Sequence, residues 1–194
     1  MGTALASLAG PALHPALART DASDARVAPD LVRRALNAME QHRDRIACRD
    51  FVAIADFSLP SRAPRLHLLN VADGRVTSHL VAHGRGSDPA HTGWLERFSN
   101  EPHSYATSAG AYRTDGIYFG SHGHAMRLEG LDPTNSNAAS RAIVVHGAWY
   151  VSDQMAGEHG VLGRSEGCFA VASSSLDEIL TRLGPGRLIY ADKV

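Results

Sequence analysis

Short apolar runs separated by turn-forming residues dominate the chain, a pattern typical of β-strands. Runs of strand length occupy 51–57, 65–70, 75–81, 116–119, 125–128, 142–146, 168–172 and 188–190. Asp73-Gly74, between the second and third runs, is a typical hairpin turn pair. Because short strands joined by turns favour antiparallel pairing, we expect a mainly β, mainly antiparallel architecture.

Two segments instead carry apolar residues at helical spacing. The first begins with Pro29 and Asp30 in favoured first-turn positions and continues with Leu31, Val32, Ala35, Leu36 and Met39. The second follows Ser174-Ser175-Leu176-Asp177, which resembles a capping box, and stops at Gly184-Pro185. We therefore expect one N-terminal helix and one short late helix around Leu176, Ile179, Leu180 and Leu183.

Two stretches have no clean periodicity. Residues 84–112 are rich in glycine, proline and small polar residues, so we expect ordered loops over one face, and long loops in compact domains are often functional. Residues 1–18 are small and apolar and end in Ala16-Leu17-Ala18, which fits a signal-peptide cleavage site without the usual basic leader. We interpret 1–28 as a signal-peptide remnant or a flexible tail, and 29–194 as the folded domain.

Composition narrows the functional classes. The 194 residues with 44% hydrophobic side chains suffice for one core. With 19 basic and 20 acidic side chains, no broad basic field exists for nucleic acid. No apolar stretch approaches the roughly 20 residues that cross a bilayer, so we expect no stable membrane insertion of the mature domain. The oligomeric state stays open.

The two cysteines differ in their surroundings. Cys48 lies just before an apolar run and is interpreted as a small buried hydrophobe. Cys168 lies between a glycine and a phenylalanine, where its thiol has little side-chain cover. A cysteine attacks as the thiolate and needs a base or a cation nearby, so Cys168 is a candidate nucleophile in search of a partner.

Among 11 histidines, His146 is the best candidate for that partner. It ends the apolar run 142–145 and precedes Gly147, which predicts an imidazole at a strand terminus with open backbone beside it. Alone, such a histidine is more often structural. His42 is expected near the end of the first helix, and His67 and His79 within strands. Paired with Cys168 on another strand end, His146 becomes a candidate general base.

His122 and His124 have a spacing common among metal ligands, and His83 or His103 could join them. This alternative gives a zinc-dependent hydrolase, but no known zinc pattern is completed. We favour His122 as part of a groove wall near His146, with no metal and no cofactor.

The residues around the pair carry a family resemblance. Val145-His146-Gly147, followed after a loop by Ser165-x-Gly167-Cys168, resembles the signature of the YkuD-like murein L,D-transpeptidases. Further segments resemble the murein L,D-transpeptidase catalytic domain family, in the correct order: 56–58, 82–87, 98–100, 108–110 and 118–151. The resemblance covers roughly residues 50 to 190. It implies an antiparallel β-sandwich or barrel and a catalytic domain over 29–194.

The resemblance also implies a reaction on peptidoglycan stem peptides. Cys168 would attack the carbonyl between the L-centre of a diamino acid and D-alanine, releasing D-alanine and leaving a thioester, with His146 moving the protons. The backbone N–H groups of Cys168 and Gly167 would stabilise the oxyanion. An acceptor amine would then give a cross-link, whereas water would make the protein an L,D-carboxypeptidase. Such an enzyme would work in the periplasm or outside the cell after export.

Two positions depart from the signature. Glu166 stands where the signature has histidine, and Ala170 stands where it has arginine. We expect Glu166 to face solvent or to pair with Arg164, and Arg141 to replace the missing arginine in binding substrate carboxylates. The other substrate-binding candidates are Ser165, Gly147, His122 and Ser121. The same departures leave a non-catalytic murein-binding module as the remaining alternative.

Overall fold

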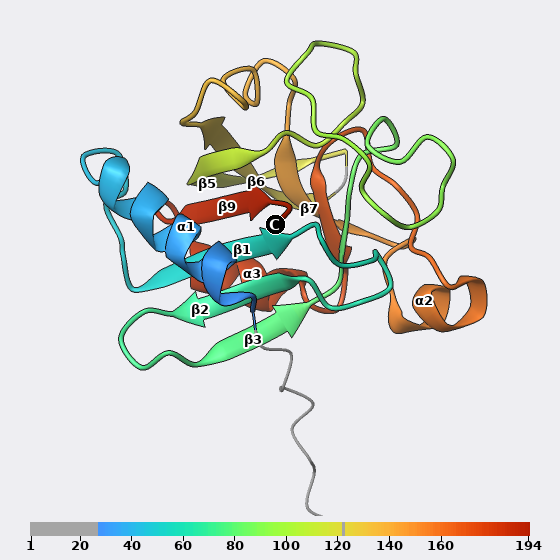
Figure 1. Ribbon diagram of the computed structural model, residues 1–194, viewed down its shortest axis with the longest axis horizontal. Helices are drawn as coiled ribbons and strands as arrows, with labels where there is room; N and C mark the ends of the chain where they lie inside the picture. Colours follow the sequence, from blue (N-terminus) through green and yellow to red (C-terminus); the bar gives the residue numbers. More distant parts are fainter. Residues whose placement is uncertain (1–26, 122) are drawn as a thin grey trace, which may run out of the picture.

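The computed structural model describes residues 27–121 and 123–194, and within them the chain forms nine strands and three helices (Figure 1). The strands are β1 (Phe51–Asp56), β2 (Leu66–Asn70), β3 (Val76–His79), β4 (Val81–Ala82), β5 (Gly110–Gly120), β6 (Gly123–Gly130), β7 (Val144–Ala148), β8 (Phe169–Ala172) and β9 (Leu188–Asp192). They form one sheet in the order β3-β2-β1-β9-β5-β6-β7-β8-β4. The predicted mainly β fold is confirmed.

The sheet is open but strongly curled. Its first strand in the order, β3, and its last, β4, are separated in the chain only by Leu80. The two ends of the hydrogen-bonded order must therefore lie close together, although no ladder closes them within the described residues. Most neighbouring strands are antiparallel, while β1 with β9 and β7 with β8 are parallel.

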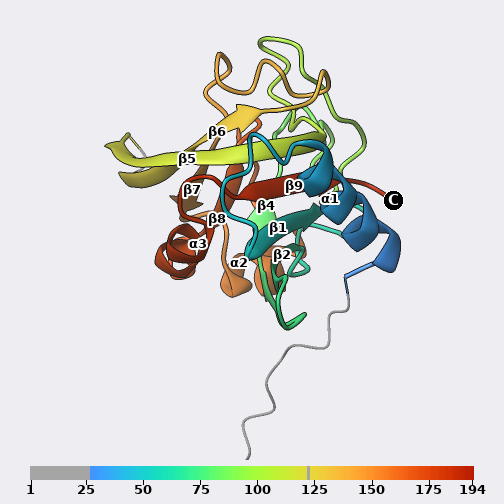
Figure 2. The ribbon, with the colours of Figure 1, turned by 90° about the vertical axis from the view of Figure 1, so that its left-hand side faces the viewer.

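Two helices cover opposite faces of the sheet. Figures 1 and 2 show α1 (Pro29–Gln41) on one side of β1 and α3 (Leu176–Leu183) on the other. Along β1, Val52 and Ile54 pack in the cluster that contains α1, whereas Ala53 and Ala55 pack in the cluster that contains α3. Because successive side chains of a strand point to opposite faces, β1 is buried on both.

The predicted helices are confirmed, with one local error. His42 follows α1, as expected, and Gly184 ends α3 by donating its N–H to the Leu180 carbonyl. The capping box was wrong, because Ser175 precedes α3 without a side-chain capping hydrogen bond. The third helix, α2 (Asp153–His159), was not predicted. None of its residues is fully buried, and only Met155 and Ala156 pack against the core, so its apolar side is too small to give a clear amphipathic pattern.

The loop prediction was also too long at one end. Residues 110–112 begin β5, which continues past a bulge between Thr114 and Ile117 into a hairpin with β6 that extends from the body in Figure 2. Elsewhere the loops are ordered by hydrogen bonds such as that from Gly86 N–H to the Tyr105 carbonyl.

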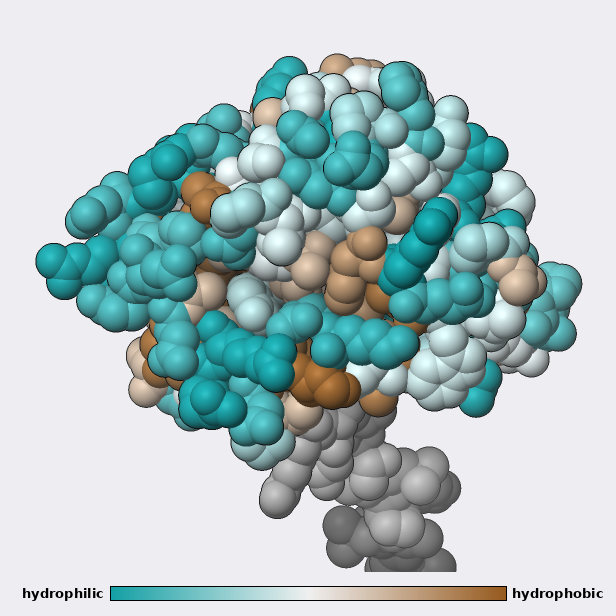
Figure 3. Space-filling view, turned by 45° about the horizontal axis from the view of Figure 1, so that its top comes forward, coloured by the Kyte–Doolittle hydropathy of each residue, from teal (hydrophilic) through white to brown (hydrophobic). Residues whose placement is uncertain are grey.

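The face in Figure 3 is largely hydrophilic, with hydrophobic side chains in small patches. Of the helices described, none has the length and apolar character to span a membrane.

Candidate active site

His146 lies on β7, and Cys168 immediately precedes β8, the parallel neighbour of β7. In the parallel pair of β7 with β8, Val145 is level with Phe169, which puts Cys168 level with Val144. Side chains two residues apart on a strand share a face, so His146 shares the face of Val144 and Cys168. His146 lies within β7 rather than at its end, because the strand continues to Ala148.

Both side chains line a pocket of about 300 Å³, which we call the Cys168 pocket. Its lining residues are Arg141, Ala142, His146, Tyr150, Arg164, Ser165, Glu166 and Cys168. Four of the predicted site residues are therefore brought together: Cys168, His146, Ser165 and Arg141. Cys48 lies elsewhere and is only partly buried, so its interpretation as a buried hydrophobe was only partly right.

The surroundings of Cys168 favour the neutral thiol. Its Sγ donates to the Ala142 carbonyl oxygen at 3.5 Å. Burial raises the pKa of the Cys168 thiol, and the nearby negative charge of Glu166 adds to this, while the Val144 N–H and the Arg141 cation act in the opposite direction. Because the net direction is upward, the thiol would need a base to remove its proton in order to act as a nucleophile.

His146 is held in a tautomer suited to that task. Its Nδ1 lies 2.9 Å from the carbonyl oxygen of Gly147. A carbonyl can only accept a hydrogen bond, so Nδ1 carries the proton in the neutral ring and Nε2 carries the lone pair. His146 as a residue is 4% exposed, so little bulk water competes for its ring nitrogens. A backbone carbonyl thus helps to orient the imidazole, a role for which no candidate could be named from the sequence.

The loop that presents Cys168 is tied to itself. The Ser165 hydroxyl donates to the Cys168 carbonyl oxygen at 2.7 Å and accepts from the Gly167 N–H at 3.2 Å. Gly167 has φ of +118°, a conformation that favours glycine. The Ser165 hydroxyl and the Gly167 N–H are therefore already used inside the loop.

Arg141 is bound by the 99–108 loop. Its guanidinium donates to the carbonyl oxygens of Ser99 and Ala106 and to the hydroxyls of Ser104 and Ser108. Because these partners are all neutral, none of them offsets the positive charge of the guanidinium at the edge of the Cys168 pocket. Arg164, on the other side, donates to the carbonyl oxygens of Asp88 and Pro89.

Glu166 does not pair with Arg164. It is 68% exposed, as one of the two expectations had it, but its partner is Arg85, whose Nη2 lies 2.9 Å from Glu166 Oε1. The Arg85 guanidinium also stacks over the Tyr105 ring at 4.0 Å. Arg164 is unavailable to Glu166 because the loop carbonyls hold it. The sequence could not reveal this, since Arg85 is far from Glu166 in the chain.

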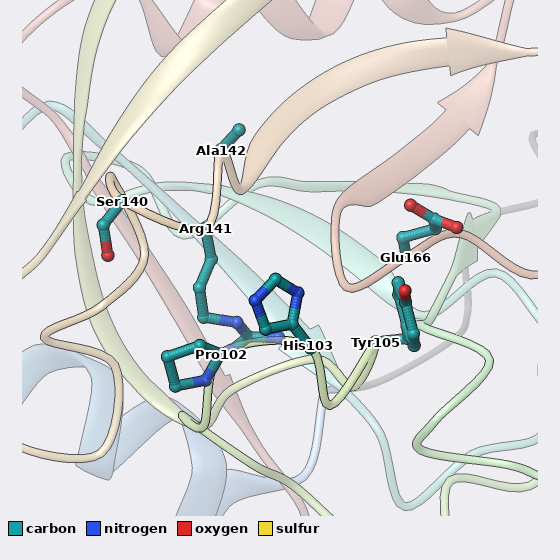
Figure 4. Close-up of a pocket in the computed structure, with 7 residues that line it drawn as sticks. All are labelled: Pro102, His103, Tyr105, Ser140, Arg141, Ala142 and Glu166. Atoms are coloured by element: carbon teal, nitrogen blue, oxygen red, sulfur yellow. The ribbon is translucent and has the colours of Figure 1, made fainter.

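A second pocket of about 370 Å³ adjoins the first, and we call it the Tyr105 pocket. It shares Arg141, Ala142 and Glu166 with the Cys168 pocket and adds Pro102, His103, Tyr105 and Ser140. Figure 4 shows Arg141 and His103 extending toward the pocket from one side, with Glu166 and Tyr105 on the other. Neither Ala142 nor Tyr105 was predicted to belong to the site. Both residues have a positive φ, a backbone conformation that could not be predicted from the residue types at these positions.

The remaining predicted residues are more dispersed. Gly147 follows His146 on β7 and supplies the carbonyl described above. Ser121 is exposed at the turn of the β5–β6 hairpin and lines neither pocket. His122 lies outside the described residues.

The zinc alternative finds no support in the described part of the chain. His83 is buried and bonded to Arg65, whereas His124 is exposed and its ring packs edge-on against Phe119. Over residues 27–121 and 123–194, no group of three or more potential ligands is arranged to hold a metal ion.

Glu166 offers a test of the electrostatics at Cys168. Glu166→Gln removes a negative charge that raises the pKa of the thiol, so Cys168 alkylation by iodoacetamide should reach its midpoint at lower pH. Because Glu166 is exposed and screened, the rate at pH 7 should rise by no more than about fivefold. Glu158→Gln, an equal charge change on α2, is the control. An alkylation midpoint that moves to higher pH, or that moves equally in Glu158→Gln, would contradict the conclusion that the Glu166 charge raises the pKa of Cys168.

Residues 23–191 match the model of the family described as L,D-transpeptidase catalytic domain. No curated protein matches the chain.

Several solved structures are similar to the chain. A mutant of the helical cell shape determining protein Pgp2 from Campylobacter jejuni has 11% identity, a TM-score of 0.48 and coverage of 86% of this chain and 57% of that one. An L,D-transpeptidase from Mycobacterium smegmatis has 13% identity, a TM-score of 0.45 and coverage of 74% and 58%. The chain spans less than two thirds of either structure. The family match over residues 23–191 confirms the resemblance inferred from the motifs, and the chain belongs to the L,D-transpeptidase catalytic domain family.

Proposed function

We propose that this protein is a cysteine acyltransferase that performs L,D-transpeptidation on peptidoglycan stem peptides. The observation that carries the proposal is that Cys168, just before β8, and His146, on the adjacent β7, line one pocket. The His146 Nδ1 is hydrogen-bonded to the Gly147 carbonyl. This is the geometry of a nucleophile beside a base whose other nitrogen is fixed.

The reaction proceeds in two transfers. As Cys168 Sγ bonds to the carbonyl carbon between the L-centre and D-alanine, His146 Nε2 takes the thiol proton. The C–N bond to D-alanine then breaks, and the imidazolium gives its proton to the departing amine, which leaves a thioester. In the second transfer an acceptor amine attacks the thioester and loses a proton through His146. The C–S bond breaks and the thiol is restored.

The groups around the pair supply charge stabilisation and binding. The Cys168 N–H is the preferred oxyanion donor, and we assign the Gly167 N–H to holding the loop, because it already donates to Ser165. Arg141 and Arg164 place positive charge on two sides of the Cys168 pocket, which favours the binding of stem-peptide carboxylates. Two adjoining pockets suit a reaction with two substrates. The proposal requires no cofactor, and its substrate places the reaction in the cell envelope, periplasmic or extracellular.

Product masses test this proposal against its alternatives. The protein is incubated with a purified muropeptide that carries a tetrapeptide stem. Cross-linked dimers formed with loss of D-alanine are expected. Monomers shortened by D-alanine alone would instead identify an L,D-carboxypeptidase. Unchanged muropeptide, together with no covalent adduct from a carbapenem, would leave a non-catalytic murein-binding module.

A further inference from the structure

Three buried titratable side chains form a chain of contacts that the reaction does not use. Arg65, His83 and Asp88 are each no more than 1% exposed. The Arg65 guanidinium donates to the carbonyl oxygens of Val81 and Leu59, and its Nη2 lies 2.8 Å from His83 Nδ1. A guanidinium can only donate, so His83 Nδ1 accepts and the ring proton is on Nε2.

Asp88 completes this chain. His83 Nε2 lies 3.4 Å from Asp88 Oδ2, which also accepts the Gly93 N–H at 2.8 Å, while Oδ1 accepts the N–H and hydroxyl of Thr92. Burial lowers the pKa of His83 to about 4 and that of Arg65 to about 9. His83 is therefore neutral near pH 7, which matches its role as acceptor from Arg65 and donor to Asp88.

The burial of these three connected side chains does not by itself show that they stabilise the fold. Removing charged groups from water is costly, and buried ionic groups are often no better for stability than apolar residues of equal volume. A fully bonded polar cluster does, however, fix local geometry. What matters is therefore which segment the cluster fixes.

That segment is the loop that carries Cys168. The His83 carbonyl accepts the Ser165 N–H at 2.9 Å, and the Arg85 N–H donates to the Ser165 carbonyl. Between them, Gly84 lies so close to the loop that an added Cβ would be 2.7 Å from the Gly167 nitrogen. Arg164 donates to the Asp88 carbonyl. Thus residues 164, 165 and 167 of the loop contact the 83–85 segment or Asp88, and the exposed side chain of Glu166 pairs with Arg85.

We propose that His83, held between Arg65 and Asp88, is a positioning residue that sets the location of the Cys168 thiol relative to His146. The inference rests on the proposed role of Cys168 as nucleophile. His83 acts through the backbone of residues 83–85 and 164–167, with no contact between His83 and substrate. A small displacement of reacting groups is enough to lower a rate by about 100-fold, so loss of this support should reduce kcat with little change in KM.

The test compares two buried histidines. His83→Gln interrupts the contacts that link Arg65, His83 and Asp88. His67→Gln makes the same change at a histidine that is also 1% exposed and that bonds Ser78 on the next strand. We measure the rate of Cys168 acylation by a carbapenem at saturation, and the thermal midpoint of each variant. His83→Gln should slow acylation by between about 10- and 100-fold, and His67→Gln should stay within about threefold at a similar loss of thermal stability.

A second readout separates this inference from the proposed function. Iodoacetamide alkylation of Cys168 is followed over pH by peptide mass, with Cys48 in the same chain as internal reference. His83→Gln should change the pH profile of Cys168 alkylation and leave the profile of Cys48 alkylation unchanged. If His83→Gln does not fold, Asp88→Asn replaces it, and the same result is expected. Acylation and alkylation equal to those of His67→Gln in both variants would overturn the positioning role. A wild-type chain without a carbapenem adduct, but with Cys168 alkylation altered by His83→Gln, would overturn the proposed function only.

Discussion

Cys168→Ala should abolish both the carbapenem adduct and turnover of tetrapeptide muropeptides. Without the sulfur no thioester can form, and removal of a catalytic nucleophile commonly costs 10⁴-fold or more, so the loss should be at least about 10⁴-fold. The fold should persist, because the side chain is only partly buried and its thiol makes a single long hydrogen bond, to Ala142. Intact-protein mass spectrometry after incubation with a carbapenem measures the adduct directly.

Cys48→Ala is the matched control for this prediction. Cys48 is also partly buried, but its N–H bonds Gly186 and it lines neither pocket. The Cys48 variant should acylate at the wild-type rate. An adduct that survives in Cys168→Ala and vanishes in Cys48→Ala would transfer the chemistry to the other thiol and contradict the proposed site.

The elements that the sequence predicts well are those whose signal is local. The run at 51–57 alternates between two buried faces, and the helix from Pro29 has an apolar stripe, so both are visible in a single window of the chain. By contrast, α2 has only two partly buried apolar residues, Met155 and Ala156, which is too few to give a periodic pattern. Residues 110–112 were assigned to a loop because the glycines and prolines that precede them mask the start of β5.

The site follows the same division. Cys168 and His146 could be proposed from their glycine neighbours and the family resemblance. The partner of Glu166 could not, because Arg85 reaches it only after the 84–109 loop folds over the Cys168 loop. The buried contact of His83 with Arg65 likewise joins the start of β2 to the end of β4. Contacts between distant segments leave no spacing in the sequence from which to infer them.

His146 carries the second large effect, and pH makes it specific. Because burial raises the pKa of Cys168, few thiolates exist near pH 7 without help from a base. His146→Gln keeps a side chain that can donate to the Gly147 carbonyl but cannot accept a proton during attack. Its residual reaction must therefore depend on thiolate that forms spontaneously, and the fraction of thiolate rises with pH up to the raised pKa.

His146→Gln should accordingly lower the rate of carbapenem acylation at pH 7 by between about 10²- and 10⁴-fold, the usual contribution of a general base. Between pH 6 and the thiol pKa, the residual rate should rise by about tenfold per pH unit, so the deficit narrows in alkaline solution. His159→Gln, at the exposed end of α2, should leave the rate and its pH profile unchanged. A deficit below about tenfold at pH 7, or one that is constant over pH, would show that another group removes the proton and that His146 serves only to shape the pocket.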